Sequence, residues 1–252
     1  MVKHQFVELD SRVRFPSSHP ILNVMTDKEI LEKVKKLTRP TYDRLKNWAH
    51  GWVHIENVAR ASKKLAQEEG ADVLACQIAA YCHDLGRLEE EKRKMVNPKP
   101  GSPSAHAVFS VNPAEKILDE VGIAGKRRED IIEAIKLHNI RKYEGPNIIF
   151  SILQDADRSD GFTKIAILRF AIFNVGLEIS KPKDRKETEQ ALGWIDEQLK
   201  NDPEKARKMI EVLEFAIGWY ENLLNFKSSA KLYRNGYLFI KKYRDDLKKL
   251  QK

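Results

Sequence analysis

Apolar residues recur at helical spacing along most of the chain, which predicts a protein built from helices. The first helix begins at a capping box, Thr26 with Glu29, and ends at Pro40. A long helical stretch follows over 41–69, with a kink near Gly51. No segment alternates apolar and polar residues for long enough to predict a sheet. Further helices are expected over 126–139, 147–157, 162–178, 184–200, 203–225 and 228–249.

The segment that follows Asp72 is apolar almost all the way round, which is typical of a buried helix. Gly70 ends the preceding helix as a C-cap, and Asp72 begins this one. The buried helix ends at Cys82, directly before His83 and Asp84. A polar pair therefore stands at the end of an element that the pattern places inside the protein.

Prolines and glycines interrupt the helical pattern in two regions. Residues 1–25 are irregular, and residues 93–104 are expected to form a surface loop. Asn112 and Pro113 then predict a new helix start, with Asn as the N-cap and Pro in the first turn.

The chain has 252 residues, of which 42% are hydrophobic, and this suits one large domain or two small ones. We expect an all-α fold, a compact multi-helix bundle with additional C-terminal helices. Residues 1–40 would be an N-terminal extension and first helix packed on the domain, 41–180 its core, and 181–252 the C-terminal helices of the same domain.

The sequence does not indicate a membrane protein or an oxidising compartment. It has no run of about 18 apolar residues, and its N-terminus lacks the charged-then-apolar layout of a signal peptide. Cys76 and Cys82 form no CxxC pattern, so we expect two buried small hydrophobic residues rather than a thiol zinc site or a redox pair. A cytoplasmic protein is the resulting expectation.

The net charge of +8 favours anionic partners but does not choose among a nucleotide, another phosphate ester and nucleic acid. Nucleic acid is less favoured, because the positive charge is spread along amphipathic helices and no zinc-finger, KH or RNP-like signature is present. No membrane partner is expected. The sequence leaves the oligomeric state open, a homo-oligomer included.

His83 and Asp84 need a partner inside the protein. Burying an ionised Asp without one is expensive, and neutral imidazole and carboxylate are both good ligands for a divalent cation. His54 lies on the inner face of the preceding predicted helix, and Asp155 lies on a later helix with an apolar face. Because neighbouring antiparallel helices can aim such side chains into one pocket, we interpret His54, His83, Asp84 and Asp155 as a metal site.

These residues resemble the H…HD…D pattern of the HD superfamily of metal-dependent phosphohydrolases. The matching segments are 54–59, 79–86 and 154–158, and the similarity extends over roughly 41–250. The resemblance makes 41–180 an HD metal-binding core, and its register selects Asp155 over Asp157 as the last ligand. It implies that a metal-activated water cleaves a phosphate ester, of a nucleotide or a related phosphorylated small molecule.

Two further histidines decide between one metal ion and two. Some members of this superfamily hold a second ion with two additional histidines, and His106 and His138 follow the HD pair in that order. Asp84 would then bridge the two ions. The alternative is that His138 is an ordinary core histidine and His106 a loop residue. His50, one turn before His54, is an alternative first ligand or a substrate-binding group.

Cationic residues near the metal site are candidates for stabilising the charge that develops on a phosphoryl group. Arg87 follows the HD pair and Arg158 follows Asp155, and we assign both, with Asp84, to the catalytic set. Either arginine could equally be an ordinary salt-bridge residue. The acidic run at 89–91 could supply a general acid or base, although a solvated run is the simpler interpretation. The metal stays open among Mn, Fe, Co, Ni, Zn and Mg.

Two other functions stay open at this point. Some relatives with a complete set of six ligands use two irons for oxygenation, which iron content and visible absorbance would reveal. A non-catalytic, metal-stabilised binding module would instead bind polyanions with a strong dependence on salt.

Overall fold

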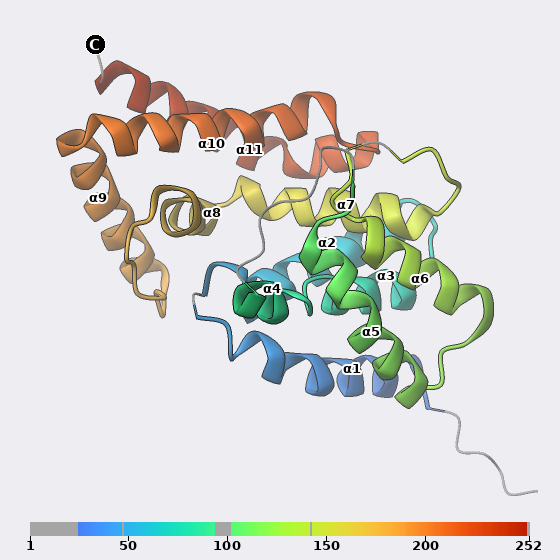
Figure 1. The fold of residues 1–252 in the computed structure, drawn as a ribbon. Helices are drawn as coiled ribbons and strands as arrows, with labels where there is room; N and C mark the ends of the chain where they lie inside the picture. Colours follow the sequence, from blue (N-terminus) through green and yellow to red (C-terminus); the bar gives the residue numbers. More distant parts are fainter. Residues whose placement is uncertain (1–24, 47, 94–101, 142, 251–252) are drawn as a thin grey trace, which may run out of the picture.

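The computed structural model describes residues 25–46, 48–93, 102–141 and 143–250, and all regular secondary structure in these residues is helical (Figure 1). The predicted all-α fold is therefore confirmed. Residues 1–24 of the segment expected to be irregular over 1–25, and most of the loop expected over 93–104, lie outside the described residues. The helices are α1 (Asp27–Tyr42), α2 (Trp52–Glu68), α3 (Val73–Cys82), α4 (Arg87–Arg93), α5 (Ala105–Glu120), α6 (Gly125–Leu137), α7 (Ile148–Ser159), α8 (Lys164–Phe170), α9 (Arg185–Asn201), α10 (Pro203–Asn222) and α11 (Lys227–Leu250).

Several helix ends occur where the sequence predicted them. The Thr26 hydroxyl accepts a hydrogen bond from the Glu29 N–H, and the Glu29 carboxylate accepts one from the Thr26 N–H, which makes the capping box of α1. Gly70 has a left-handed φ of 65° after α2, as expected of a C-cap glycine. Asp72 caps α3, since its carboxylate accepts a hydrogen bond of 3.0 Å from the Ala75 N–H.

The prediction that Pro40 ends the first helix is wrong, because α1 continues to Tyr42. A proline in the last turn of a helix removes one backbone hydrogen bond. Tyr42 is buried and its hydroxyl donates to the Tyr81 carbonyl at 2.8 Å, so tertiary contacts hold this turn in place. The helical stretch expected over 41–69, with a kink near Gly51, is broken there more fully than predicted, since the 3₁₀ turn Trp48–His50 precedes α2 and Gly51 is the N-cap of α2.

The helix start predicted at Asn112 is wrong as well. α5 begins after Ser104, whose hydroxyl accepts a hydrogen bond from the Ala107 N–H, and Pro113 lies in the helix interior. Buried side chains continue on both sides of the proline, so packing of the helix face outweighs the lost hydrogen bond. As a consequence, His106 belongs to the first turn of a helix and not to a loop.

The buried hydrophobic residues form two clusters, one in α1 to α7 and one in α8 to α11. The first ends at Ala156 and the second begins at Phe162, so α8 packs with the C-terminal helices. α7 contacts both α10 and α11, which joins the two clusters, and Figure 1 shows α10 and α11 side by side along one edge of the molecule. The boundary expected at 180 stays a prediction.

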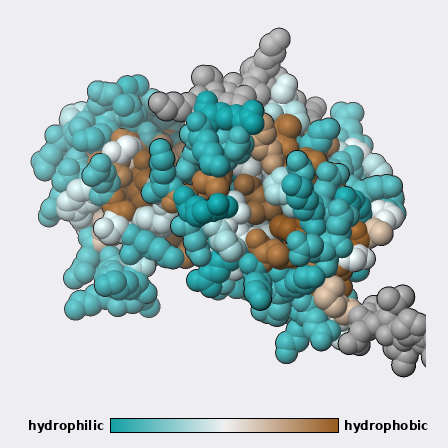
Figure 2. Space-filling view, turned by 60° about the horizontal axis from the view of Figure 1, so that its bottom comes forward, coloured by the Kyte–Doolittle hydropathy of each residue, from teal (hydrophilic) through white to brown (hydrophobic). Residues whose placement is uncertain are grey.

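Hydrophilic residues cover most of the face drawn in Figure 2, with hydrophobic residues exposed between them. Cys76 and Cys82 are buried and unpaired, as predicted, and burial raises the pKa of both thiols to about 12. Within the described ranges, no helix combines the length and the apolar character needed to cross a membrane.

Candidate metal centre

Helix ends and inner helix faces bring histidine and aspartate side chains to one buried place. α2 carries His54, α7 carries Asp157, and His83 and Asp84 follow the end of α3. The first turn of α5 and the end of α6 add two more histidines. We call the complete set the His/Asp cluster: His54, His83, Asp84, His106, His138 and Asp157.

Asp84 lies between two groups of histidines in the His/Asp cluster, one of His54 and His83 and the other of His106 and His138. Its Oδ2 lies 3.8 Å from Nε2 of His54 and 3.7 Å from Nε2 of His83. Its Oδ1 lies 3.5 Å from Nε2 of His106 and 3.9 Å from Nε2 of His138. Each group, with Asp84 included, has its donor atoms within 4.8 Å of one another. The carboxylate thus presents one oxygen to each group, as a bridging ligand would.

Asp157, and not Asp155, is the α7 carboxylate at the His/Asp cluster. Its Oδ1 lies 3.4 Å from Nε2 of His54 and 3.8 Å from Nε2 of His83. Residues two apart on an α-helix point about 200° from one another, so Asp155 and Asp157 cannot both face the cluster. The expected placement of Asp155 beside the histidines is therefore corrected by the structure.

Asp155 instead connects α7 to the turn between α10 and α11. It is fully buried, and its carboxylate accepts hydrogen bonds from the backbone N–H groups of Asn225 (2.9 Å) and Phe226 (3.2 Å). Burial raises the pKa of Asp155 above its usual value. Arg158 supports the same turn, since it pairs with Asp155 at 3.8 Å and donates to the Leu223 carbonyl.

Hydrogen bonds at Nδ1 orient the histidines that end α3 and α6. His83 Nδ1 donates to the Ala80 carbonyl at 2.8 Å, and His138 Nδ1 donates to the Ile135 carbonyl at 2.7 Å. Because a carbonyl oxygen can only accept, Nε2 carries the lone pair in each neutral ring. Burial lowers the pKa of His138 well below its usual value, which favours that neutral ring. This is the tautomer that a metal ligand needs.

Asp160 orients His54 in the same way, and the sequence reasoning missed it. Its Oδ2 accepts from Nδ1 of His54 at 2.9 Å, and its Oδ1 accepts from Nδ2 of Asn57 at 2.7 Å. The Arg169 guanidinium forms an ion pair with the same carboxylate. Burial lowers the pKa of His54 well below its usual value. The sequence did carry a signal, because Asp160 follows Asp157 by three residues and such pairs share a helix face.

The His/Asp cluster contains two buried atoms without a hydrogen-bond partner among the described residues, His83 Nε2 and Asp84 Oδ1. Burial by itself would raise the pKa of Asp84, but the Arg87 guanidinium, with Nε at 3.1 Å from Oδ2, holds it well below its usual range. Arg87 pairs with Oδ2 alone, so Oδ1 stays buried without a partner in the part of the chain that the structure describes, which is costly unless a further cation joins it. The donor set therefore fits a divalent metal ion.

Arg87 lies directly beside the His/Asp cluster and connects it to α4. Besides its bond to Asp84, its Nη1 donates to Oε2 of Glu90 at 3.1 Å. The other oxygen of Glu90 lies 3.2 Å from Nδ1 of His106. The acidic run at 89–91, for which a solvated role was the simpler interpretation, therefore places one carboxylate in the site.

Gly86 allows α5 to approach the turn after the HD pair. A Cβ at this position would overlap the His106 carbonyl oxygen and lie 2.7 Å from both Phe109 Cβ and Ser110 N. We expect Gly86→Ala to lower the free energy of unfolding by about 1–3 kcal/mol, the usual effect of overpacking, in a urea titration. Gly193→Ala is the control, because a Cβ there meets nothing within 4 Å. An equal effect of both variants would contradict this explanation.

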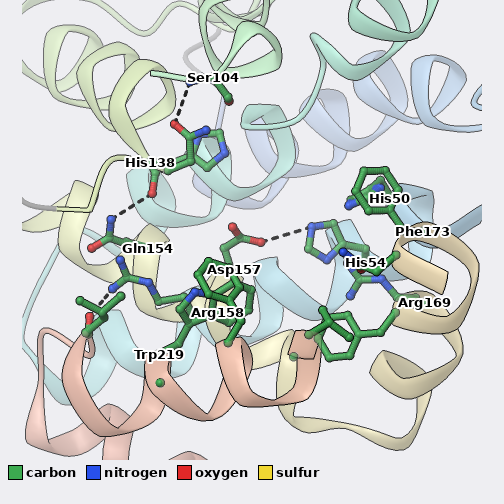
Figure 3. Close-up of a pocket in the computed structure, with 18 of the residues that line it drawn as sticks. His50, His54, Ser104, His138, Gln154, Asp157, Arg158, Arg169, Phe173 and Trp219 are labelled. Atoms are coloured by element: carbon green, nitrogen blue, oxygen red, sulfur yellow. Dashed lines mark hydrogen bonds and ion pairs between the residues drawn. The ribbon is translucent and has the colours of Figure 1, made fainter. Parts of the chain in front are cut away.

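A cavity of about 650 Å³ lies beside the His/Asp cluster (Figure 3). His54, His106, His138 and Asp157 line it, and Figure 3 shows the Asp157 carboxylate pointing towards His54. The remaining walls are rich in cationic and aromatic side chains. These are Arg87, Arg141, Arg158, Arg169, Phe170, Phe173, Phe215 and Trp219.

His50, the alternative first ligand, lines the same cavity but lies in the turn before α2. Its ring centroid is 6.0 Å from that of His54 and 4.6 Å from that of Phe173. None of the groups of metal-ligating atoms includes it. The structure therefore places His54, and not His50, in the His/Asp cluster.

Residues 51–161 match the HD domain family. The chain contains an HD domain. All six residues of the His/Asp cluster fall inside the matched range, whereas α8 to α11 follow it. Two parts of the chain therefore form the cavity, because the HD domain supplies His54, His106 and His138 and α10 supplies Phe215 and Trp219.

Solved structures share this fold beyond the HD domain itself. The Lin1889 protein of Listeria innocua is 17% identical, with a TM-score of 0.57 over 89% of this chain and 96% of its own. An HD-superfamily hydrolase from Bacillus thuringiensis is 18% identical, with a TM-score of 0.55 over 89% and 97%. Bacillus subtilis YpgQ in complex with ADP is 18% identical, with a TM-score of 0.53 over 89% and 96%. No curated protein matches the chain by sequence.

Proposed function

We propose that this protein is a metal-dependent phosphohydrolase that cleaves a phosphate ester of a nucleotide or a related phosphorylated small molecule. The observation that carries the proposal is the buried, ionised Asp84 between two groups of histidines, beside a cavity lined with arginines. The HD domain supports it, since solved structures with the same fold include a hydrolase.

The His/Asp cluster would hold one or two divalent ions. The first set of ligands would be His54, His83 and Asp84, joined by Asp157, whose Oδ1 lies within 3.8 Å of both histidines, and the second would be Asp84, His106 and His138. Imidazole and carboxylate ligands are compatible with Mn, Fe, Co, Ni, Zn or Mg. Such an ion supplies an activated water and polarises a phosphoryl oxygen.

The arginines of the cavity would bind and orient the phosphate group. Arg87 is fixed between Asp84 and Glu90, and Arg169 is fixed by Asp160, so both guanidinium groups are held in place before a substrate arrives. Positioned charges stabilise developing negative charge without reorganisation. Arg158 lines the same cavity, and we retain it as a candidate for this role.

A nucleotide is the substrate class that we favour. The cavity combines cationic side chains for phosphate groups with aromatic side chains on which a base can stack. YpgQ, a solved structure with a similar fold, was crystallised in complex with ADP. Both points support a nucleotide over a phosphorylated sugar or a simple phosphomonoester.

A panel of nucleoside mono-, di- and triphosphates, phosphomonoesters and phosphodiesters tests the proposal. We expect turnover of at least one nucleotide that stops when EDTA removes the metal and returns when a divalent ion is added, because the ion supplies the activated water. Phosphate or pyrophosphate release and nucleotide chromatography measure it, with Mn, Fe, Co, Ni, Zn and Mg added in turn.

Other outcomes would contradict the hydrolase. Metal-replete protein without turnover across the whole panel would do so. Bound iron with visible absorbance that shifts on reduction would favour the di-iron oxygenase. Salt-dependent binding of polyanions that survives His83→Ala, without turnover, would favour a non-catalytic module.

A further inference from the structure

Two phenylalanines of the cavity are unusually exposed. Phe173 is 55% exposed and Phe215 is 64% exposed, and both line the cavity beside the His/Asp cluster. No other phenylalanine among the described residues is exposed to this degree. Leaving an aromatic ring in water forgoes the free energy of its burial. Two such rings on one cavity therefore indicate a ligand with an apolar face.

Each ring is fixed on one side by a second aromatic ring. Phe173 packs against His50 with centroids 4.6 Å apart at 81°, and Phe215 packs against Trp219 with centroids 5.1 Å apart at 63°. Such edge contacts hold a ring in place, yet more than half of each phenylalanine remains accessible. The rings are therefore positioned in advance for a flat ligand.

The backbone around Phe173 is also specialised. It lies in the π-helical turn Ala171–Val175, which contacts α10, the helix that carries Phe215. Single π-turns occur frequently at functional sites. Gly176 ends the turn with a left-handed φ of 79°, and the Leu177 N–H donates to the Ala171 carbonyl at 2.9 Å. The turn brings Phe173 onto the same cavity as α10.

The charges of the cavity identify the rest of the ligand. Arg87, Arg158 and Arg169 line the cavity together with these aromatic rings, and Figure 3 shows Arg169, Phe173 and Trp219 around the same space as Asp157. A ligand with both an anionic part and a flat apolar part matches these walls. A nucleotide has this composition, whereas inorganic phosphates and sugar phosphates lack the flat part.

We propose that Phe173 and Phe215 are specificity-determining residues that bind the base of a nucleotide by stacking, while its phosphate groups face Arg87 and the His/Asp cluster. This inference rests on the proposed function for its phosphate end. Stacking does not depend on the identity of the base, so the two phenylalanines select nucleotides as a class and not one nucleobase.

The test compares ligands with and without a base on the metal-loaded protein. Titration calorimetry measures the affinity of the non-hydrolysable α,β-methylene analogue of ADP and of methylenediphosphonate, which lacks the nucleoside. We expect Phe173→Ala and Phe215→Ala each to weaken binding of the analogue about tenfold, as loss of one stacking partner does. Binding of methylenediphosphonate should change less than twofold.

Trp194→Ala is the control, because Trp194 is an aromatic residue, 40% exposed, that does not line this cavity. It should leave both affinities unchanged. Since Phe173 and Phe215 are largely exposed, their variants should fold, and thermal melting verifies this. Equal weakening of both ligands, unchanged affinity for the analogue, or a wild-type protein that binds neither ligand would overturn the proposal. Phenylalanine-dependent binding without turnover would leave it intact and refute the hydrolase instead.

Discussion

Asp157→Asn is expected to lower metal-dependent turnover by about 10³-fold and to reduce the amount of bound metal. The Asp157 carboxylate lies 3.4 Å from Nε2 of His54 and 3.8 Å from Nε2 of His83, so the amide would remove a negative charge from this group. Metal ions contribute several kcal/mol to transition-state stabilisation, and each tenfold in rate corresponds to about 1.4 kcal/mol. Elemental analysis and steady-state kinetics measure the two effects.

Asp155→Asn is the matched control, with the same chemical change two residues away on the same helix. Asp155→Asn should retain the metal, because in the unchanged protein the Asp155 carboxylate bonds to the backbone of Asn225 and Phe226 and not to the His/Asp cluster. It should instead lower the free energy of unfolding by about 1–3 kcal/mol, since a neutral amide accepts these bonds less well. If Asp155→Asn lost the metal and Asp157→Asn kept it, the placement of α7 described above would be wrong.

Asp160→Ala should have the largest effect on stability. Asp160 is 2% exposed and accepts hydrogen bonds from His54 and Asn57 while it pairs with Arg169. Burial already lowers the pKa of Arg169 to about 10. Removing the only carboxylate that directly pairs with this guanidinium in the described structure leaves a buried charge, and such changes cost about 3–5 kcal/mol. Urea unfolding followed by circular dichroism measures it.

Asp160→Ala should also weaken metal binding about 10–100-fold, because loss of a residue that orients a ligand histidine typically has this effect. Asp245→Ala is the control, because this half-exposed residue pairs with Arg244, which also pairs with Glu214, and its loss should change stability by less than about 1 kcal/mol. In the double variant with Arg169→Met, part of the lost stability should return. A double variant no more stable than Asp160→Ala would argue against the buried charge as the cause.

The C-terminal helices complete the cavity that the HD domain begins. The His/Asp cluster lies wholly within residues 51–161, but the aromatic side chains of the cavity wall come from the end of α8, the π-helical turn and α10. Asp155 and Arg158 attach the α10–α11 turn to α7. Asp155 lies two residues before Asp157, and Arg158 lies one residue after it. Changes at this junction should therefore alter the aromatic wall while the metal stays bound.

Local sequence determined the helical fold and the centre of the site. Helical spacing of apolar residues, with caps such as Thr26 and Asp72, is a property of short segments and does not depend on the rest of the chain. His83 and Asp84 were found because they end a helix that is apolar on every side, and both are buried in the structure. A polar pair in such a place is informative whatever packs around it.

Tertiary structure decided which residues join that centre. Asp155 and Asp157 are nearly equivalent in sequence, and Asp155 is withdrawn from the cluster by hydrogen bonds to Asn225, 70 residues later. Packing on both sides of Pro113 allows α5 to begin at Ala105, and this start places His106 in a helix. The direction in which a helix faces is set by what packs on it, and no local pattern contains that partner.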